Sequence, residues 1–279
     1  MYTCAAESSL VKTIKAPDNV CGLALLDKKL YVLRQRPEKQ ISFYTTDTFE
    51  LSDDYISIPD LSVNESGWND MTECVAEKCL FVSDYDGKCI RKVCLKEGVT
   101  VRKFCELAYA PKGLSITPEG NLLVSCDPNT LLELDVKTGG MVCEVELQSD
   151  IEFPKHAIKR EDKQYVLSYD VKDGPHRVCI VGPDGYLRHA YGGKPGSGDL
   201  QLHTPSHLAP TSGNHLIVAD SDNWRIVLLN SALEFVRYIG VDLREPYRLF
   251  FDKQASRLYV AERTTGNIKV FYVPPYQTK

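Results

Sequence analysis

The sequence has no long apolar run and no excess of basic charge. None of its hydrophobic stretches approaches the roughly 18 residues that a membrane-spanning helix needs, so we expect no membrane association. The first residues, MYTCAAESSLVKTIKAP, lack the basic segment and apolar core of an export signal, which predicts a cytoplasmic protein. With a formal net charge of −5 and a pI near 5.7, no global positive field draws the chain to nucleic acid.

Motifs for catalysis are also missing. The sequence has no G-x-S-x-G elbow and no Cys/His signature of a nucleophile. A chain of 279 residues can build its own apolar core, so its ten cysteines are not needed as a disulfide framework. We predict that most of them are reduced and buried, as Cys21, Cys126 and Cys179 indicate by lying in apolar runs. We therefore expect no enzyme, no cofactor, no metal and no small-molecule substrate.

What the sequence does contain is a repeat. Six short β-rich segments recur, and their starts are separated by 50, 42, 42, 52 and 42 residues. They are LYVLR from Leu30, LFVSD from Leu80, LLVSC from Leu122, QYVLS from Gln164, LIVAD from Leu216 and LYVAE from Leu258. Because a repeat of 20 to 50 residues is typical of solenoids, propellers and arrays, this period decides the fold class.

Each unit predicts four strands. An apolar stretch precedes the repeated segment, a third stretch follows it, and a fourth closes most units, with turn residues such as Gly182-Pro-Asp-Gly185 between them. No helical periodicity is long enough to cover a sheet. The prediction is one all-β domain, 1–279, a six-bladed β-propeller with four antiparallel strands per blade. The predicted blades are 17–61, 62–109, 110–152, 153–192, 203–241, and 245–273 together with 8–15.

The last unit has only three strands, and the N-terminal segment supplies the missing one. We predict that Leu10 to Ile14 pairs with Ile268 to Tyr272 and closes the ring. Such closure removes both exposed sheet edges, which otherwise are templates for aggregation.

The stretch from Tyr191 to Asn230, YGGKPGSGDLQLHTPSHLAPTSGNHLIVADSDNWRIVLLN, resembles an NHL repeat in almost every motif position. Blades two and six, with FVSDYDGKCIRKV and YVAERTTGNIKVF, repeat the pattern. Arg34, Cys126 and Ser168 stand where the family prefers Asp; where Asp84 and Asp220 occur, we expect them to hydrogen-bond the following turn. NHL propellers are commonly the C-terminal domain of TRIM-type ubiquitin ligases, so the resemblance implies a TRIM-like context with protein or single-stranded RNA partners.

The innermost strand of each blade begins at one face of the central channel, which we call the strand-start face. The six first residues there, by alignment, are Gly22, Asp70, Gly113, His156, His207 and Arg248. Loops between second and third strands open on the same face. The residues expected to contact a partner are Arg34, Trp68, Tyr85, Lys112, Lys155, His156, His207, Trp224, Tyr247, Arg248 and Arg263.

Three functions fit such a face. Trp, Tyr and Arg dominate protein-binding hot spots, and interleaved acidic residues make the face mixed in charge, so we expect a protein or peptide partner. Cations beside aromatic rings also suit single-stranded RNA, the alternative. A metal-dependent activity is a remote alternative, because two imidazoles and the Asp70 carboxylate can bind zinc or iron. The peptide-amidating lyases, which resemble NHL propellers, hold zinc with three strand-start histidines, and this chain has two.

Overall fold

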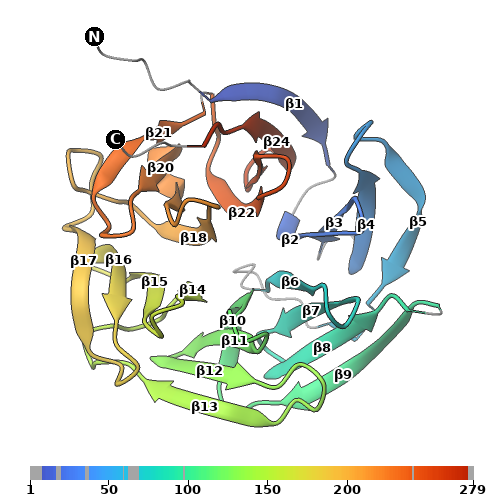
Figure 1. The fold of residues 1–279 in the computed structure, drawn as a ribbon, viewed down its shortest axis with the longest axis horizontal. Coiled ribbons are helices and arrows are strands. Elements are labelled where there is room, and N and C mark those ends of the chain that lie inside the picture. The colour runs from blue at the N-terminus through green and yellow to red at the C-terminus, as the bar shows by residue number, and fades with distance from the viewer. Residues whose placement is uncertain are drawn as a thin grey trace.

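The structure is a computed structural model, and it describes residues 8–16, 20–34, 38–58, 60–61, 69–96, 98–240 and 242–275. Six four-stranded antiparallel sheets stand around a central axis like the blades of a propeller (Figure 1). The predicted fold class is confirmed. Apart from one 3₁₀ turn, η1 at Ser221–Asn223, the described elements are all strands.

The first three blades follow one another along the chain, each running from the axis to the rim. They consist of β2 (Val20–Leu26), β3 (Lys29–Arg34), β4 (Gln40–Thr45) and β5 (Leu51–Ser57); β6 (Met71–Cys74), β7 (Cys79–Asp84), β8 (Cys89–Cys94) and β9 (Thr100–Glu106); and β10 (Ala110–Ile116), β11 (Leu122–Asp127), β12 (Thr130–Leu134) and β13 (Met141–Glu146).

The other three blades complete the ring. They consist of β14 (His156–Lys159), β15 (Tyr165–Asp170), β16 (His176–Val181) and β17 (Leu187–Gly193); β18 (Pro205–Pro210), β19 (Leu216–Asp220), β20 (Arg225–Leu229) and β21 (Phe235–Ile239); and β22 (Pro246–Asp252), β23 (Arg257–Glu262), β24 (Asn267–Tyr272) and β1 (Ser9–Lys15).

The sixth blade joins the two ends of the described chain. β1 pairs antiparallel with β24, with Ile14 opposite Ile268 and Leu10 opposite Phe271, as the sequence predicts (Figure 1). Paired antiparallel strands are joined by backbone hydrogen bonds, so this pairing fastens the first described strand to the last and closes the ring.

The core consists of six apolar clusters, most of which lie between neighbouring blades. The second strand of each blade is almost entirely buried, and β7 and β19 are buried along their whole length, because both faces of these strands pack against apolar side chains. The outermost strands alternate exposed and buried residues or are largely exposed, as in β5. The six repeated β-rich segments therefore form the interior of the blades.

Two expectations about particular side chains are confirmed. Asp84 accepts a hydrogen bond from Gly87 N at 3.2 Å, and Asp220 accepts one from the Asn223 side chain at 2.8 Å, so both stabilise the turn that follows.

The nine cysteines among the described residues form no disulfide, and six of them are buried. In that part of the chain there is no helix that is long and apolar enough to cross a membrane.

Candidate functional site: the strand-start cluster and the axial channel

The innermost strands are irregular at the point where they reach the strand-start face. In β2, β18 and β22 the pairing register shifts immediately before Gly22, His207 and Arg248. A bulge bends a strand and redirects the side chains next to it. The bulges therefore let the first residues of different blades turn toward the axis, where they meet.

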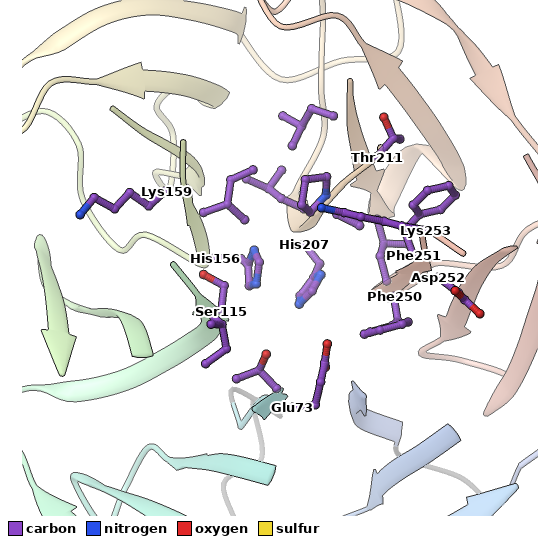
Figure 2. Close-up of a pocket in the computed structure, with 18 of the residues that line it drawn as sticks. Glu73, Ser115, His156, Lys159, His207, Thr211, Phe250, Phe251, Asp252 and Lys253 are labelled. Atoms are coloured by element: carbon purple, nitrogen blue, oxygen red, sulfur yellow. The ribbon is translucent and has the colours of Figure 1, made fainter. Parts of the chain in front are cut away.

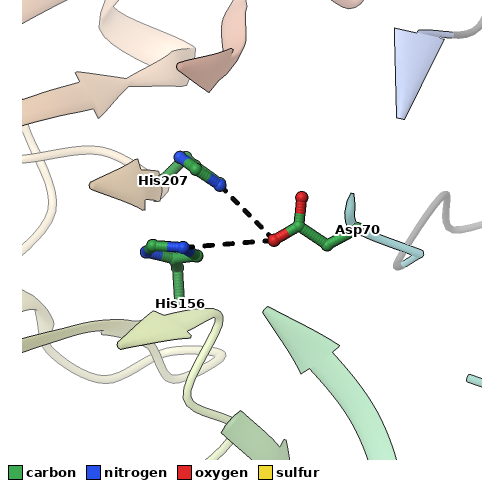
Figure 3. A group of neighbouring side chains, drawn as sticks. All are labelled: Asp70, His156 and His207. Atoms are coloured by element: carbon green, nitrogen blue, oxygen red, sulfur yellow. Dashed lines mark ion pairs between the residues drawn. The ribbon is translucent and has the colours of Figure 1, made fainter. Parts of the chain in front are cut away.

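Four charged or titratable side chains meet there, and we call Asp70, His156, His207 and Arg248 the strand-start cluster. The Asp70 Oδ2 atom lies 3.4 Å from His207 Nε2 and 4.0 Å from His156 Nε2 (Figure 3). The Arg248 Nε atom lies 3.3 Å from Asp70 Oδ1. The two imidazole rings stack, with their centroids 3.8 Å apart. All four side chains are buried. The short distances between them confirm the sequence-based expectation that these strand-start residues converge.

The two remaining strand-start positions are glycines because their neighbours come too close for a side chain. A Cβ atom on Gly113 would lie 2.5 Å from the Lys155 carbonyl oxygen and 2.7 Å from His156 Cα. One on Gly22 would lie 2.7 Å from Met71 Cβ. Their missing side chains let adjacent blades approach closely, which closes the axis around the cluster.

Backbone groups complete the cluster. Leu114 N donates to Asp70 Oδ2 at 3.0 Å, and Leu114 O lies 3.1 Å from His156 Nε2. The Arg248 guanidinium donates to Cys21 O at 2.7 Å and to Asn69 O at 3.0 Å. The cluster thus ties β2, β6, β10, β14, β18 and β22 together at one end of the axis.

Burial and mutual charge set the protonation states in this cluster. Burial alone would raise the pKa of Asp70, but Arg248, His207 and His156 outweigh it and hold that pKa below its usual range. Burial lowers the pKa of His207, and burial together with the neighbouring His207 ring lowers the pKa of His156 well below its usual value. At neutral pH the cluster is therefore a carboxylate paired with a guanidinium beside two neutral imidazoles.

Asp70, His156 and His207 form the group of potential metal ligands among the described residues, with one ligand atom of each within 4.8 Å of the others. Two observations argue against a cation there. The Leu114 carbonyl oxygen can only accept a hydrogen bond, so a neutral His156 in contact with it carries its hydrogen on Nε2, and that nitrogen then has no lone pair for a metal. Arg248 already neutralises Asp70, so a divalent ion would add uncompensated charge to a buried site.

Around the cluster, further predicted contact residues form buried ion pairs. Lys112 Nζ lies 2.5 Å from Asp127 Oδ1, and Lys155 Nζ lies 2.6 Å from Asp170 Oδ2. Tyr85, half-buried, donates to Asp127 Oδ2 at 2.7 Å. The two ion pairs lie within blade three and blade four, and the Tyr85 hydrogen bond links blade two to blade three.

The other predicted contact residues differ in exposure. Arg34 is buried and donates to Ser42 at 2.9 Å within its own blade. Tyr247 is buried between the guanidinium groups of Arg248 and Arg263, 4.0 and 5.2 Å from its ring centroid. Trp224 and Arg263 are exposed. Trp68 lies outside the described residues.

Sequence reasoning missed two residues of this face. Phe153 is 43% exposed just before β14, and Lys112 Nζ lies 5.3 Å from its ring centroid. Arg244 lies over the Trp224 ring, with its Cζ atom 5.0 Å from the centroid. Phe153 lies three residues before His156 and Arg244 lies four residues before Arg248, so extending the alignment of strand starts by four residues toward the N-terminus would have included both.

Behind the cluster lies a channel along the axis, with a volume of about 1070 Å³. His156 and His207 line it, as do the later residues of all six innermost strands and the turns that follow them, such as Pro118, Thr211 and Lys253 (Figure 2). We call this space the axial channel. It opens on the face opposite the strand-start face, and the two histidines lie at its closed end.

One further titratable residue in the channel wall was not predicted. Glu73 of β6 lines the axial channel, and burial raises its pKa to about 8 although the N–H groups of Glu73 and Leu25 act in the opposite direction. Counting three residues from each strand start would have found it, because the same position holds Leu25 in blade one and Ile116 in blade three.

No protein-family model matches the chain, and no curated protein matches its sequence. The fold is similar to several solved propellers. The β-propeller domain of Cps50 (Swd1) from Myceliophteria thermophila aligns with a TM-score of 0.63 and 12% identity, over 96% of this chain and 100% of that one. Virginiamycin B lyase from Staphylococcus aureus, a catalytically inactive histidine-to-alanine variant with quinupristin, aligns at 0.65 and 14%, over 96% and 100%. A Bacteroides thetaiotaomicron protein of unknown function aligns at 0.67 and 12%, over 96% and 72%.

Proposed function

We propose that this propeller is a non-catalytic binding scaffold whose strand-start face recognises a peptide segment of another protein. The observation that carries the proposal is a pair of exposed aromatic side chains, Phe153 and Trp224, on an otherwise rigid face. Trp224 is 53% exposed and Phe153 is 43% exposed. Large aromatic side chains that remain exposed on a fixed surface are typical anchors of protein interfaces.

Each of these rings has a cation beside it. Arg244 lies over Trp224 and Lys112 lies near Phe153, so a partner that covers either ring also meets a positive charge. Cation–π contacts fix the orientation of a ring and strengthen when a partner removes water from them. We expect the bound segment to supply apolar side chains for both rings and one acidic group, for Arg244.

Charge favours a peptide over RNA at this face. Its cations are largely engaged by carboxylates: Lys112 pairs with Asp127, Lys155 with Asp170, and Arg263 Nη1 lies 3.6 Å from Glu245 Oε1. Phosphate groups would have to compete with these partners, and the chain carries a net charge of −5. Single-stranded RNA is therefore the second outcome that an experiment must test.

The non-catalytic part of the proposal concerns the strand-start cluster. The fold is shared with virginiamycin B lyase, but a common propeller does not transfer an activity. His156 and His207 are neutral, buried and engaged with Leu114 O and Asp70, which suits a structural role at the centre of the ring. The NHL-like repeat supports placing the scaffold in a larger TRIM-like, cytoplasmic protein as its partner-recruiting domain.

Parallel selections test the proposal. A displayed library of random peptides and a pool of random single-stranded RNA are each enriched on the purified propeller. We expect a peptide motif to emerge, and its affinity to fall at least about tenfold with Trp224→Ala or Phe153→Ala, which corresponds to about 1.4 kcal/mol.

Tyr55→Ala is the matched control, since Tyr55 is an exposed aromatic residue on the outer strand β5 and should leave the affinity unchanged. If an RNA motif that depends on Trp224 were enriched and no peptide were, the ligand of this face would be single-stranded RNA and not a peptide. Peptides that bind both alanine variants as tightly as the unmodified protein would remove the face from consideration.

A further inference from the structure

The axial channel is a second concave site, distinct from the strand-start face. Its volume of about 1070 Å³ is slightly above the range of about 300 to 1000 Å³ that is usual for small-molecule pockets. The buried cluster separates the channel from the strand-start face, because Arg248, Lys112 and Lys155 do not line it whereas His156 and His207 do. A ligand must therefore enter from the opposite face.

The wall of the channel is mainly apolar near its closed end. Leu25, Ile116, Ile158 and Phe250 come from four different innermost strands and are all only partly buried, since they face the open space. Such a wall removes water from the body of an apolar ligand, which is the usual source of affinity in a pocket of this kind.

Glu73 interrupts this apolar wall. Its carboxyl group lies in the same space as the two histidine rings (Figure 2). Within the described part of the chain it forms no ion pair; the groups that interact with it favourably are the N–H groups of Leu25 and of Glu73 itself. A buried carboxyl group without a cation keeps its proton at neutral pH, and it loses the proton when a cation is placed beside it.

The other charged groups that face the channel do not neutralise Glu73. Lys159 is engaged by Glu133 at 2.9 Å and by Glu119 at 3.2 Å. The closed end is neutral because His156 and His207 are uncharged. At the mouth, charged residues of both signs alternate; they are Asp27, Lys28, Arg160, Glu161, Asp162, Asp252 and Lys253.

The closed end also contains hydrogen-bond acceptors without donors. In the neutral rings of His156 and His207 the Nδ1 atoms have no hydrogen-bond partner among the described residues. Both Nδ1 atoms are buried out of reach of a ligand, so the partly exposed Glu73 carboxyl group is the titratable acceptor available to one in this part of the channel.

We infer that the axial channel binds a small amphipathic amine, with its ammonium group paired to Glu73 and its apolar body against Leu25, Ile158 and Phe250. Such an ion pair in the partly buried wall of a channel is stronger than one on the open surface, because less water surrounds the two charges. The ligand enters from the face opposite the proposed peptide site, so each site can be tested without the other.

Three probes of similar size test the inference on the unmodified protein: 2-phenylethylamine, 2-phenylethanol and phenylacetate. Ligand-detected NMR and calorimetry measure the affinity of each. We expect the amine to bind at least about tenfold more tightly than the alcohol, and phenylacetate not to bind. At pH 7 the amine should displace a proton from Glu73, so the binding heat changes with the ionisation enthalpy of the buffer. At about pH 9, where Glu73 is mostly ionised and the amine is still mostly protonated, this dependence should be much weaker.

Two variants locate the site. Glu73→Gln keeps the shape of the side chain and should reduce amine affinity to that of the alcohol. Glu161→Gln removes an exposed carboxylate at the channel mouth and should leave the affinity unchanged. The comparison of probes on the unmodified protein decides the matter even if Glu73→Gln does not fold. Equal binding of amine and alcohol, no binding by any probe at millimolar concentration, or full amine affinity in folded Glu73→Gln would overturn the inference.

Discussion

The two ends of the axis differ in the partners that they provide for a carboxyl group. In the strand-start cluster, the Asp70 carboxylate has a guanidinium, two imidazoles and the Leu114 N–H around it. In the axial channel, the groups of the described residues that favour the charged form of Glu73 are the backbone N–H groups of Leu25 and Glu73. The pKa of Asp70 is accordingly below its usual range, whereas that of Glu73 is raised to about 8.

The difference separates a structural role from a binding role. Where every partner is supplied by the chain, a buried charge fastens the six blades to one another. Where the partner is missing, the same kind of side chain reduces stability and remains available to a ligand. Substitutions at the two ends should therefore have opposite effects on stability, and the predictions below follow that contrast from the largest effect to the smallest.

The largest effect is expected from Asp70→Asn. The variant leaves the Arg248 guanidinium buried without its carboxylate, and removing one partner of a buried pair typically costs about 3 to 5 kcal/mol. Chemical denaturation at pH 7 measures the change. Asp184→Asn breaks the exposed pair with Arg188 instead and should change the free energy of unfolding by less than about 0.5 kcal/mol. Similar losses in both variants would contradict the structural role of the cluster.

A smaller loss is expected from Gly113→Ala. The added methyl group would lie 2.5 Å from the Lys155 carbonyl oxygen, so blades three and four must move apart, at a cost of about 1 to 3 kcal/mol. Gly193→Ala is the matched control, because a Cβ atom there has no neighbour within 4 Å. Thermal unfolding of the two variants compares them, and an equal shift in Tm would show that the close approach at the axis is unimportant.

At the other end of the axis, Glu73→Gln should stabilise the protein as pH rises. The pKa of Glu73 is about 8 in the folded state, above its ordinary value of 4.5, so the unfolded chain ionises first and stability is lost between these values. The unmodified protein should lose up to about 1 kcal/mol per pH unit relative to Glu73→Gln from pH 5 to 8. Denaturation curves at pH 5, 6.5 and 8 measure this. Parallel pH profiles would mean that Glu73 is not shielded from water.

The smallest effect should come from the exposed aromatic residues. Trp224→Ala and Phe153→Ala remove side chains that are 53% and 43% exposed, so we expect changes in unfolding free energy within about 0.5 kcal/mol. A loss above 2 kcal/mol in either variant would assign that ring to the fold and not to a partner.

Sequence reasoning found the fold because the repeat recurs six times, and a period in the chain becomes a period in space. The strand-start residues converge for the same reason: the alignment that places Asp70, His156 and His207 at equivalent positions also places them around one axis. Burial could not be predicted in this way. Lys112, Lys155 and Tyr247 fit an exposed surface by residue type, yet bulges and glycines draw the blades together and bury them. Counting along the innermost strands would have placed Glu73 in the channel wall, but its raised pKa depends on burial with no cation beside it among the described residues, which only the structure gives.

A hydrogen-exchange footprint of the propeller with a selected peptide tests the central claim most directly. The account predicts slower exchange in the segments that surround the exposed rings, at the β19–β20 turn and in the residues leading into β14 and β22, with the outer strands β5, β9 and β13 unchanged. Protection confined to the outer strands or to the mouth of the axial channel would contradict it.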